Sequence, residues 1–460
     1  MQLTAEQLYE GLARLTPARR AGFVADALAS VPPEDAHLAE AAPFIAPLSL
    51  DVAQVRGAMH RTQVLLDALI RLEEHVLTPE GEPLRQRLVH SLEPGSARLV
   101  AQCTHESRYS LQRRLRRMDA FLEPTTGRYS VIEVNQVAPL SFRPHDVDQR
   151  LAARLMEALG FDYTPRLLAP RILRWLQGEL HARHPGRELR LVALVSEHGY
   201  PAKSGLPGLA QLVQEAAREA GFSTEVVHCY PPEVRRVGGR PVLAGREVDV
   251  IWRQSVFLDW YRERGEDVSD YEALCSHPEE HLIVNSTRSF LTASKEAFAL
   301  LCEPEVQRAL RLPVEAVAVL GETVPETVSL AHAAHRRVEV LEDRAAWISK
   351  PTDSSFGQGI EFGTRHTADS WARLVEARSG DGFVFQRRVG YPVLRWPQVT
   401  RSGELVRRDI EFDFCPHQVD GAMAGTAFIR AHLRDATVGS DRVMNVSSGS
   451  CMVPFLAPAD

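Results

Sequence analysis

The residue that this chain most conspicuously lacks is lysine. Of its 460 residues, 53 are Lys or Arg, yet only Lys203, Lys295 and Lys350 are lysines. Arginine therefore fills nearly every ordinary surface position, and a remaining lysine is a candidate for a role that a planar guanidinium cannot fill. Holding a phosphate oxygen with a compact point charge is one such role. The alternative is that the three lysines persist on the surface by chance.

Other absences exclude whole classes of protein. The six cysteines form no CxxC pair, which favours reduced thiols and a cytoplasmic location. No apolar run approaches the ~20 residues of a membrane span, and the first fifteen residues are typical of an amphipathic helix and not of a signal peptide. A net charge of -7 offers no basic surface for nucleic acid. We expect small-molecule partners, with neither nucleic acid nor membrane.

Periodicity predicts an α/β (α+β) fold with four segments. Residues 1–100 form a helical N-terminal region, and residues 101–185 are strand-rich, with two strands joined by a turn at Thr126-Gly127. Residues 186–290 alternate apolar strands with an amphipathic helix, which predicts an inserted parallel sheet. Residues 291–460 contain a helix, a strand ending at Lys350, a glycine-bearing loop and further strands.

Three local patterns carry chemistry. Lys350 ends a strand and precedes a loop with Gly357 and Gly359, whose backbone could close over phosphate oxygens, although an ordinary hairpin loop would read the same. Lys295 begins a helix upstream. Glu133 and Asn135 alternate on a strand, so they share one face and offer hard oxygen ligands for Mg²⁺. Each pattern alone is a weak signal.

Together these patterns resemble the ATP site of the ATP-grasp superfamily. The order, with Glu133 and Asn135 before the lysines, is similar to the circularly permuted branch of eukaryotic-type glutathione synthetase and glutathionylspermidine synthetase-like ligases. The resemblance covers roughly residues 110–460. It implies an ATP-grasp fold with an inserted Rossmann-like substrate domain at 186–290 and the nucleotide-binding domain and its lid at 291–460.

The resemblance also implies an activity. A ligase of this kind joins a carboxylate to an amine through an acyl phosphate, uses ATP and Mg²⁺, and acts on amino-acid or peptide substrates, commonly as a homodimer. The implied residues are Arg117, Arg253 and Arg430 for the catalytic carboxylate clamp, Lys295, Lys350, Ser355, Gly357, Gln358, Gly359, Gln386 and Asn445 for ATP, Glu133, Asn135 and Asp353 for the metal, and Asp119 and Lys203 for substrate.

One departure from the family keeps an alternative open. Ser354 stands where the family has a metal-binding glutamate, with Asp353 beside it. The chain could therefore be an ATP-binding homologue with weak or no activity and a regulatory role. The Asp409, Glu411 and Asp413 alternation could add a metal ligand, but we expect a solvated strand face.

A remote alternative is a zinc hydrolase. Residues 277–281 read His-Pro-Glu-Glu-His, the inverted zinc pattern, but Pro278 permits only the start of a helix there.

Overall fold

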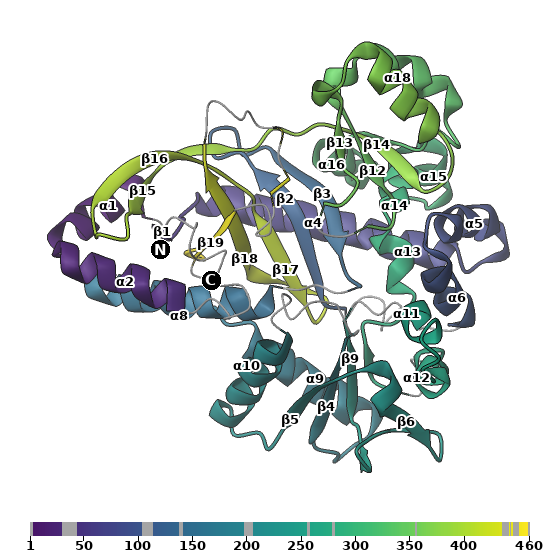
Figure 1. The fold of residues 1–460 in the computed structure, drawn as a ribbon, viewed down its shortest axis with the longest axis horizontal. Helices are drawn as coiled ribbons and strands as arrows, with labels where there is room; N and C mark the ends of the chain where they lie inside the picture. Colours follow the sequence, from purple (N-terminus) through teal and green to yellow (C-terminus); the bar gives the residue numbers. More distant parts are fainter. Residues whose placement is uncertain are drawn as a thin grey trace.

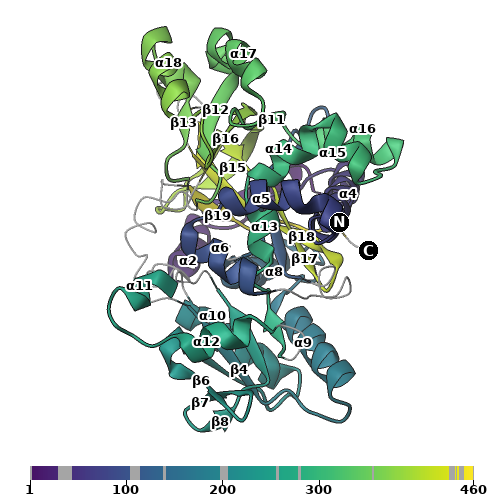
Figure 2. The same ribbon diagram turned by 90° about the vertical axis from the view of Figure 1, so that its right-hand side faces the viewer.

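The computed structural model describes residues 3–29, 44–103, 114–137, 141–196, 206–254, 258–277, 281–354, 357–434, 441, 443–444 and 450–458. These residues form a large antiparallel sheet in the middle, a parallel sheet at one end and a small antiparallel sheet at the other (Figures 1 and 2). The expected mixed fold of helices with an antiparallel and a parallel sheet is confirmed.

The central sheet gathers strands from distant parts of the chain. Its described strands run in the order β1-β15-β16-β18-β17-β2-β3, and β19 pairs with β18. Their bounds are β1 Phe44–Ile45, β2 Arg116–Leu122, β3 Tyr129–Asn135, β15 Val393–Val399, β16 Leu405–Phe412, β17 Cys415–Val419, β18 Ala422–Leu433 and β19 Cys451–Val453. The predicted hairpin at 115–135 is therefore β2 and β3, and β3 is an edge strand of this sheet.

Helices from the first 160 residues lie around the central sheet, except for α5 and α6, which pack beside the helix at residues 289–293 (Figure 1). They are α1 Ala5–Arg14, α2 Pro17–Ala29, α4 Val52–His75, α5 Glu82–His90, α6 Pro94–Gln102 and α8 Phe142–Leu159. Asp51 caps α4 by accepting a hydrogen bond from the Gln54 N–H, and the apolar stripe of α4 buries Val55, Leu65 and Leu69. α4 packs against β2 and β18, and Gln54 and Arg61 on α4 donate hydrogen bonds to the Pro124 and Gly127 carbonyls in the turn between β2 and β3.

The parallel sheet follows, as predicted for residues 186–290. Its order is β5-β4-β9-β10, with strands β4 Leu191–Val195, β5 Glu225–Cys229, β9 Val250–Arg253 and β10 Ile283–Val284, and with helices α9 Ala169–Arg183, α10 Leu206–Glu219, α11 Leu258–Arg262 and α12 Ser269–Cys275. Every residue of β4 is buried, as the uniformly apolar pattern predicts for a covered strand. Sequence periodicity missed the short sheet of β6 Val234–Val237, β7 Arg240–Leu243 and β8 Arg246–Glu247.

The small antiparallel sheet has a separate core. Its order is β11-β14-β12-β13, with bounds β11 Thr327–Val328, β12 Trp347–Pro351, β13 Glu361–Phe362 and β14 Phe383–Arg387. Helices α13 Ser289–Ala293, α14 Glu296–Cys302, α15 Pro304–Ala309 and α16 Val314–Thr323 lead into it, and α17 Arg337–Glu342 and α18 Ala368–Ala377 cover it. Trp347, Trp371 and Phe385 fill the core, and the Trp371 indole donates to the Val340 carbonyl at 2.9 Å.

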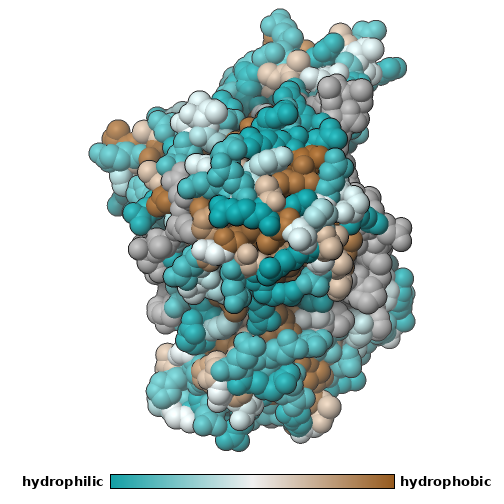
Figure 3. Space-filling view, turned by 90° about the vertical axis from the view of Figure 1, so that its left-hand side faces the viewer, coloured by the Kyte–Doolittle hydropathy of each residue, from teal (hydrophilic) through white to brown (hydrophobic). Residues whose placement is uncertain are grey.

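One face of the molecule is mostly hydrophilic, with apolar side chains gathered near its middle (Figure 3). No helix in the described part of the chain is both long enough and apolar enough to cross a bilayer. The homodimer stays a prediction.

Candidate active site

Four polar side chains share one face of the β2–β3 hairpin. The antiparallel register places Arg117 opposite Asn135 and Asp119 opposite Glu133, and alternate residues of a strand lie on the same face. Asp119 Oδ1 accepts hydrogen bonds from Arg117 Nε and from Asn135 Nδ2, each at 3.0 Å. The amide nitrogen of Asn135 donates to Asp119. The amide oxygen of Asn135 is therefore the atom that can bind a cation.

Arg430 links this hairpin to β18. Its Nη2 donates to Asp119 Oδ2 at 2.9 Å and its Nε to Asp413 Oδ2 at 2.6 Å. Burial alone would raise the pKa of Asp119, but Arg117 and Arg430 together hold it well below its usual range. Asp119 therefore stays ionised and fixes both guanidinium groups at the end of the hairpin.

Lys295 connects three segments through its backbone and side chain. It precedes α14, and its N–H donates to the Thr352 carbonyl at 3.0 Å. Its Nζ donates to the Ser354 carbonyl at 3.0 Å and lies 3.5 Å from Glu133 Oε2. Only 4% of the side chain is exposed. The structure therefore brings Lys295 together with the predicted metal ligand on β3 and the loop after β12.

Lys350 enters the same region from β12. Its Nζ donates to Gln386 Oε1 on β14 at 2.7 Å, and the Gln386 amide nitrogen donates to the Thr327 hydroxyl at 3.0 Å. Burial lowers the pKa of Lys350 to about 8, with Glu133 opposing the shift and Lys295 adding to it. Two cations and a carboxylate from three separate segments thus influence one another at one site.

The glycine loop reaches the C-terminal part of the chain. Gly357 and Gly359 have φ values of +72° and +70°, which residues with a Cβ rarely adopt. A Cβ on Gly357 would lie 2.5 Å from Val443, and one on Gly359 would lie 2.8 Å from Pro351. Gln358 between them is exposed. Glycine is required here by the backbone and by close packing, and the predicted closure of the loop over phosphate stays a prediction.

Asp353 has a hydrogen-bond partner outside the hairpin. Its Oδ2 accepts the backbone N–H of Glu93 at 3.0 Å, at the N-terminus of α6. Burial raises the pKa of Asp353, with the Glu93 N–H and Lys295 opposing. Among the described residues, no group of three or more His, Cys, Asp or Glu side chains could hold a metal. Glu133 and Asn135 still suit Mg²⁺, because that ion usually takes one or two protein ligands and completes its shell with phosphate and water.

Arg253 lies elsewhere, at the carboxyl end of β9. Its guanidinium donates to the carbonyls of Asn285 at 3.0 Å and Ser286 at 2.9 Å, and to the Ser289 hydroxyl at 3.1 Å. Burial lowers its pKa. In the described residues its contacts hold the turn after β10 and do not reach the lysines. Its predicted part in the carboxylate clamp therefore stays a prediction.

The expectation of a solvated strand face at Glu411 and Asp413 is wrong. Both side chains are buried, Asp413 against Arg430 and Glu411 Oε2 at 2.7 Å from His432 Nε2. Glu411 on β16 and Asp413 just beyond its end have polar partners on β18, in His432 and Arg430, whereas Asp409 is 45% exposed beside Arg395. Sequence reasoning also missed Thr327, since its contact with Gln386 spans 59 residues.

Some predicted residues cannot be placed. Lys203, Ser355 and Asn445 lie outside the described residues. The same holds for residues 278–280 of the zinc pattern. His277 follows α12 and His281 lies in a turn, so neither is described as helical.

No known family model and no curated protein sequence matches the chain. Its structure is similar to that of a glutathione synthetase-like effector from Globodera pallida in apo form, with a TM-score of 0.56, 12% identity, and coverage of 90% of this chain and 89% of that one. The chain has a glutathione synthetase-like fold. A proposed γ-glutamylcysteine synthetase from Methylobacillus flagellatus KT also aligns, at 13% identity and 90% coverage of both chains. Its TM-score is 0.38, which is too low to show a shared fold.

Proposed function

We propose that the protein is an ATP-grasp ligase of the circularly permuted type, joining a carboxylate to an amine with conversion of ATP to ADP and phosphate. The observation that supports this most is the convergence of Lys295, Lys350 and Glu133 from α14, β12 and β3. Phosphoryl transfer depends mainly on positioning and on neutralising charge. Two buried ammonium groups beside a carboxylate and an amide oxygen provide both.

Each residue then has a role. Lys295 and Lys350 hold the phosphates, and Gln386 orients Lys350 through the 2.7 Å hydrogen bond at the end where the adenine would lie. Glu133 and Asn135 would hold Mg²⁺, which supplies charge neutralisation on the phosphate oxygens. The glycine loop at 357–359 would close over the nucleotide.

The reaction proceeds in two steps. A substrate carboxylate oxygen attacks the γ-phosphorus, the bond from that phosphorus to the bridging oxygen breaks, and ADP leaves. The amine then attacks the acyl carbon, phosphate leaves, and the amine proton passes to solvent. Arg117 and Arg430 carry positive charge at the end of the hairpin, where they would receive the carboxylate alongside Asp119.

The test is Mg²⁺-dependent release of ADP with pooled amino acids and short peptides. We expect turnover that needs both a carboxylate and an amine and that is lost in Lys350→Met and Lys295→Met. Arg408→Met is the matched control, because that arginine is an exposed cation on β16, and it should behave like wild type. Failure to bind ATP would refute the proposal.

A second candidate is an ATP-binding protein without turnover. It is favoured by Ser354 in place of a carboxylate and by Asp353, whose oxygen bonds to the Glu93 N–H. ATP binding that Lys350→Met abolishes, with no ADP release from any pool, would support this second function over the first.

A further inference from the structure

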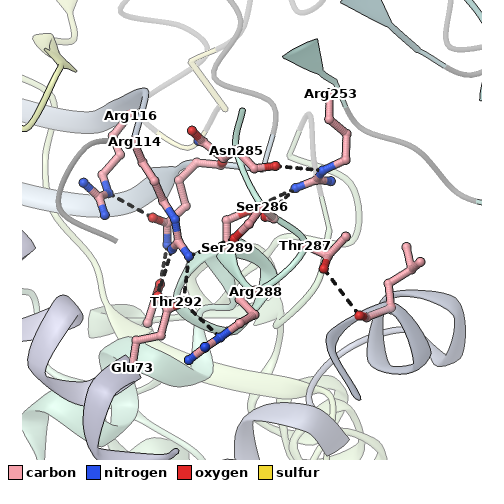
Figure 4. A network of polar contacts seen from close by, with 12 residues as sticks. Glu73, Arg114, Arg116, Arg253, Asn285, Ser286, Thr287, Arg288, Ser289 and Thr292 are labelled. Carbon is pink, nitrogen blue, oxygen red and sulfur yellow. Dashed lines mark hydrogen bonds and ion pairs between the residues drawn. The ribbon is translucent and has the colours of Figure 1, made fainter. Parts of the chain in front are cut away.

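A cluster of buried arginines lies outside the proposed ATP site. Arg114, Arg116, Arg253 and Arg288 are each 2% exposed or less, and Glu73 is the one carboxylate drawn among them (Figure 4). They come from the start of β2, the end of β9 and the turn before α13, with Glu73 on α4. Buried charges are tolerated when they are paired and hydrogen-bonded. The hydrogen-bond acceptors of each arginine therefore show whether its buried charge is compensated.

Glu73 already accepts hydrogen bonds from two other residues. Its two oxygens accept from the two Nη atoms of Arg114, each at 2.8 Å, in a fork. Oε2 also accepts the Thr292 hydroxyl at 3.1 Å. Arg116 donates to amide oxygens of Gln136 and Gln418. One carboxylate therefore forms direct hydrogen bonds to one arginine only, and its less occupied oxygen, Oε1, lies 3.9 Å from Arg288 Nε.

Arg288 is left with a charge and no acceptor. It is 1% exposed, and its Nε, Nη1 and Nη2 have no hydrogen-bond partner in the described structure. Its closest carboxylate oxygen, Glu73 Oε1, lies 3.9 Å from Nε, beyond hydrogen-bonding distance. The Nη1–Nη2 edge, which matches the two oxygens of a carboxylate or phosphate, is farther still from that acid. Five N–H bonds of a fully charged group thus lack acceptors.

Arg253, which contacts the turn of residues 285–289, also has an N–H group without a hydrogen-bond acceptor in the described structure. Three of its contacts go to neutral oxygens, and its Nη1 has no partner among the described residues. The next residue, Gln254, is wholly buried with both amide atoms unpaired in the described structure. Among the described residues the Gln254 oxygen lacks a donor, but the unpaired N–H groups of Arg253, Gln254 and Arg288 lie on both sides of this turn and together indicate a missing acceptor.

We propose that Arg288 forms a buried oxyanion subsite, in which a carboxylate or a phosphate-type group binds the Nη1–Nη2 edge beside the Arg114–Glu73 pair. Such a ligand supplies two acceptor oxygens and a negative charge, which are what the arginine lacks. The subsite is independent of the lysines, so it holds or fails separately from the proposed ligase activity. Its occupant is either an acid group of the substrate or a free inorganic oxyanion.

The test is thermal unfolding of the whole chain, dialysed free of oxyanions and then titrated with phosphate, sulfate or succinate, with chloride at matched ionic strength. We expect a saturable rise in the unfolding temperature of the wild type. Arg288→Met should weaken the apparent affinity by about tenfold or more, the loss expected for a charge-assisted hydrogen-bonded pair. Lys350→Met should retain the response, which separates this subsite from the ATP site, and Arg408→Met should match the wild type.

Each outcome decides the proposal. A stronger response to succinate identifies a carboxylate ligand, and one to phosphate or sulfate identifies an inorganic oxyanion. No response beyond chloride, an equal response in Arg288→Met, or complete loss in Lys350→Met would overturn the subsite. If Arg288→Met does not fold, Arg288→Lys decides, because it keeps the charge and loses the fork: a weakened response supports the subsite, and an unchanged response overturns it.

Discussion

Lys350 should titrate near pH 8 in the ATP-free protein. Burial lowers its pKa from the usual 10.5 to about 8. At about 1.4 kcal/mol per pH unit, this difference represents roughly 3 kcal/mol spent on keeping a buried ammonium charged. Because the folded pKa is the lower one, the unfolded chain binds more protons between pH 8 and 10.5, so this residue makes stability rise with pH across that window.

The scarcity of lysine makes the measurement direct. Protein labelled with ¹³C at lysine Cε has only three lysine signals, from Lys203, Lys295 and Lys350, and the signal lost in Lys350→Met identifies the third. We expect its midpoint near pH 8 without ligand and a higher midpoint with MgATP, because phosphate favours the charged form. At pH 8, ATP binding should then take up about half a proton, measurable by calorimetry in buffers of different ionisation enthalpy.

Two variants separate charge from packing. Lys350→Met removes the buried charge and also the 2.7 Å hydrogen bond to Gln386, a loss of about 1 kcal/mol that only partly offsets the gain. We therefore expect a higher unfolding temperature at pH 7 together with loss of ATP binding. Lys350→Arg cannot shed its charge and should be less stable than wild type. A lysine midpoint at or above pH 10, with no proton uptake, would refute this reasoning.

Three further predictions test the neighbouring groups. Glu133→Gln should lower Mg²⁺-dependent ADP release by about 100-fold or more, since it removes the carboxylate that lies 3.5 Å from Lys295 Nζ. Unchanged Mg²⁺-dependent ADP release in steady-state assays would contradict this role. Asp119→Asn should lower the free energy of unfolding by about 3 kcal/mol, because Arg430 loses a buried ionic partner; denaturant titration measures it, and a change below about 1 kcal/mol would contradict it. Asp353→Ala should lose about 1 kcal/mol of stability but retain ADP release, because its oxygen caps α6 through the Glu93 N–H; loss of activity without loss of stability would instead restore its metal role.

Short-range patterns predicted how the hairpin part of the candidate site is arranged. Arg117, Asp119, Glu133 and Asn135 belong to one hairpin, so alternation and one turn suffice to place them on a common face. Composition singled out the lysines, because an ammonium retained in an arginine-rich chain is a candidate for a role that arginine cannot fill. The alternation of apolar strands and helix likewise predicted the parallel sheet before any contact was visible.

Long-range pairing could not be predicted in the same way. Asp413 and Arg430 face each other because β16 and β18 are neighbours in the central sheet, and alternation on one strand does not reveal which of its faces is covered. Asp353 follows Lys350 closely in sequence, yet α6 captures its carboxylate from a segment 260 residues away. The Arg114–Glu73 fork joins β2 to a helix that the sequence marks only by its apolar face.

The two cation sites use different chemistry for a physical reason. Arginine keeps its charge at any ordinary pH, so a buried guanidinium requires permanent acceptors, and Arg114 has them in Glu73. Lysine can lose its proton when no anion is present, so Lys350 can stay buried at a pKa of about 8 and recharge as phosphate arrives. A site that is alternately empty and filled with phosphate is therefore better served by lysine. By the same argument, a buried arginine without acceptors, such as Arg288, is expected to hold its anion persistently.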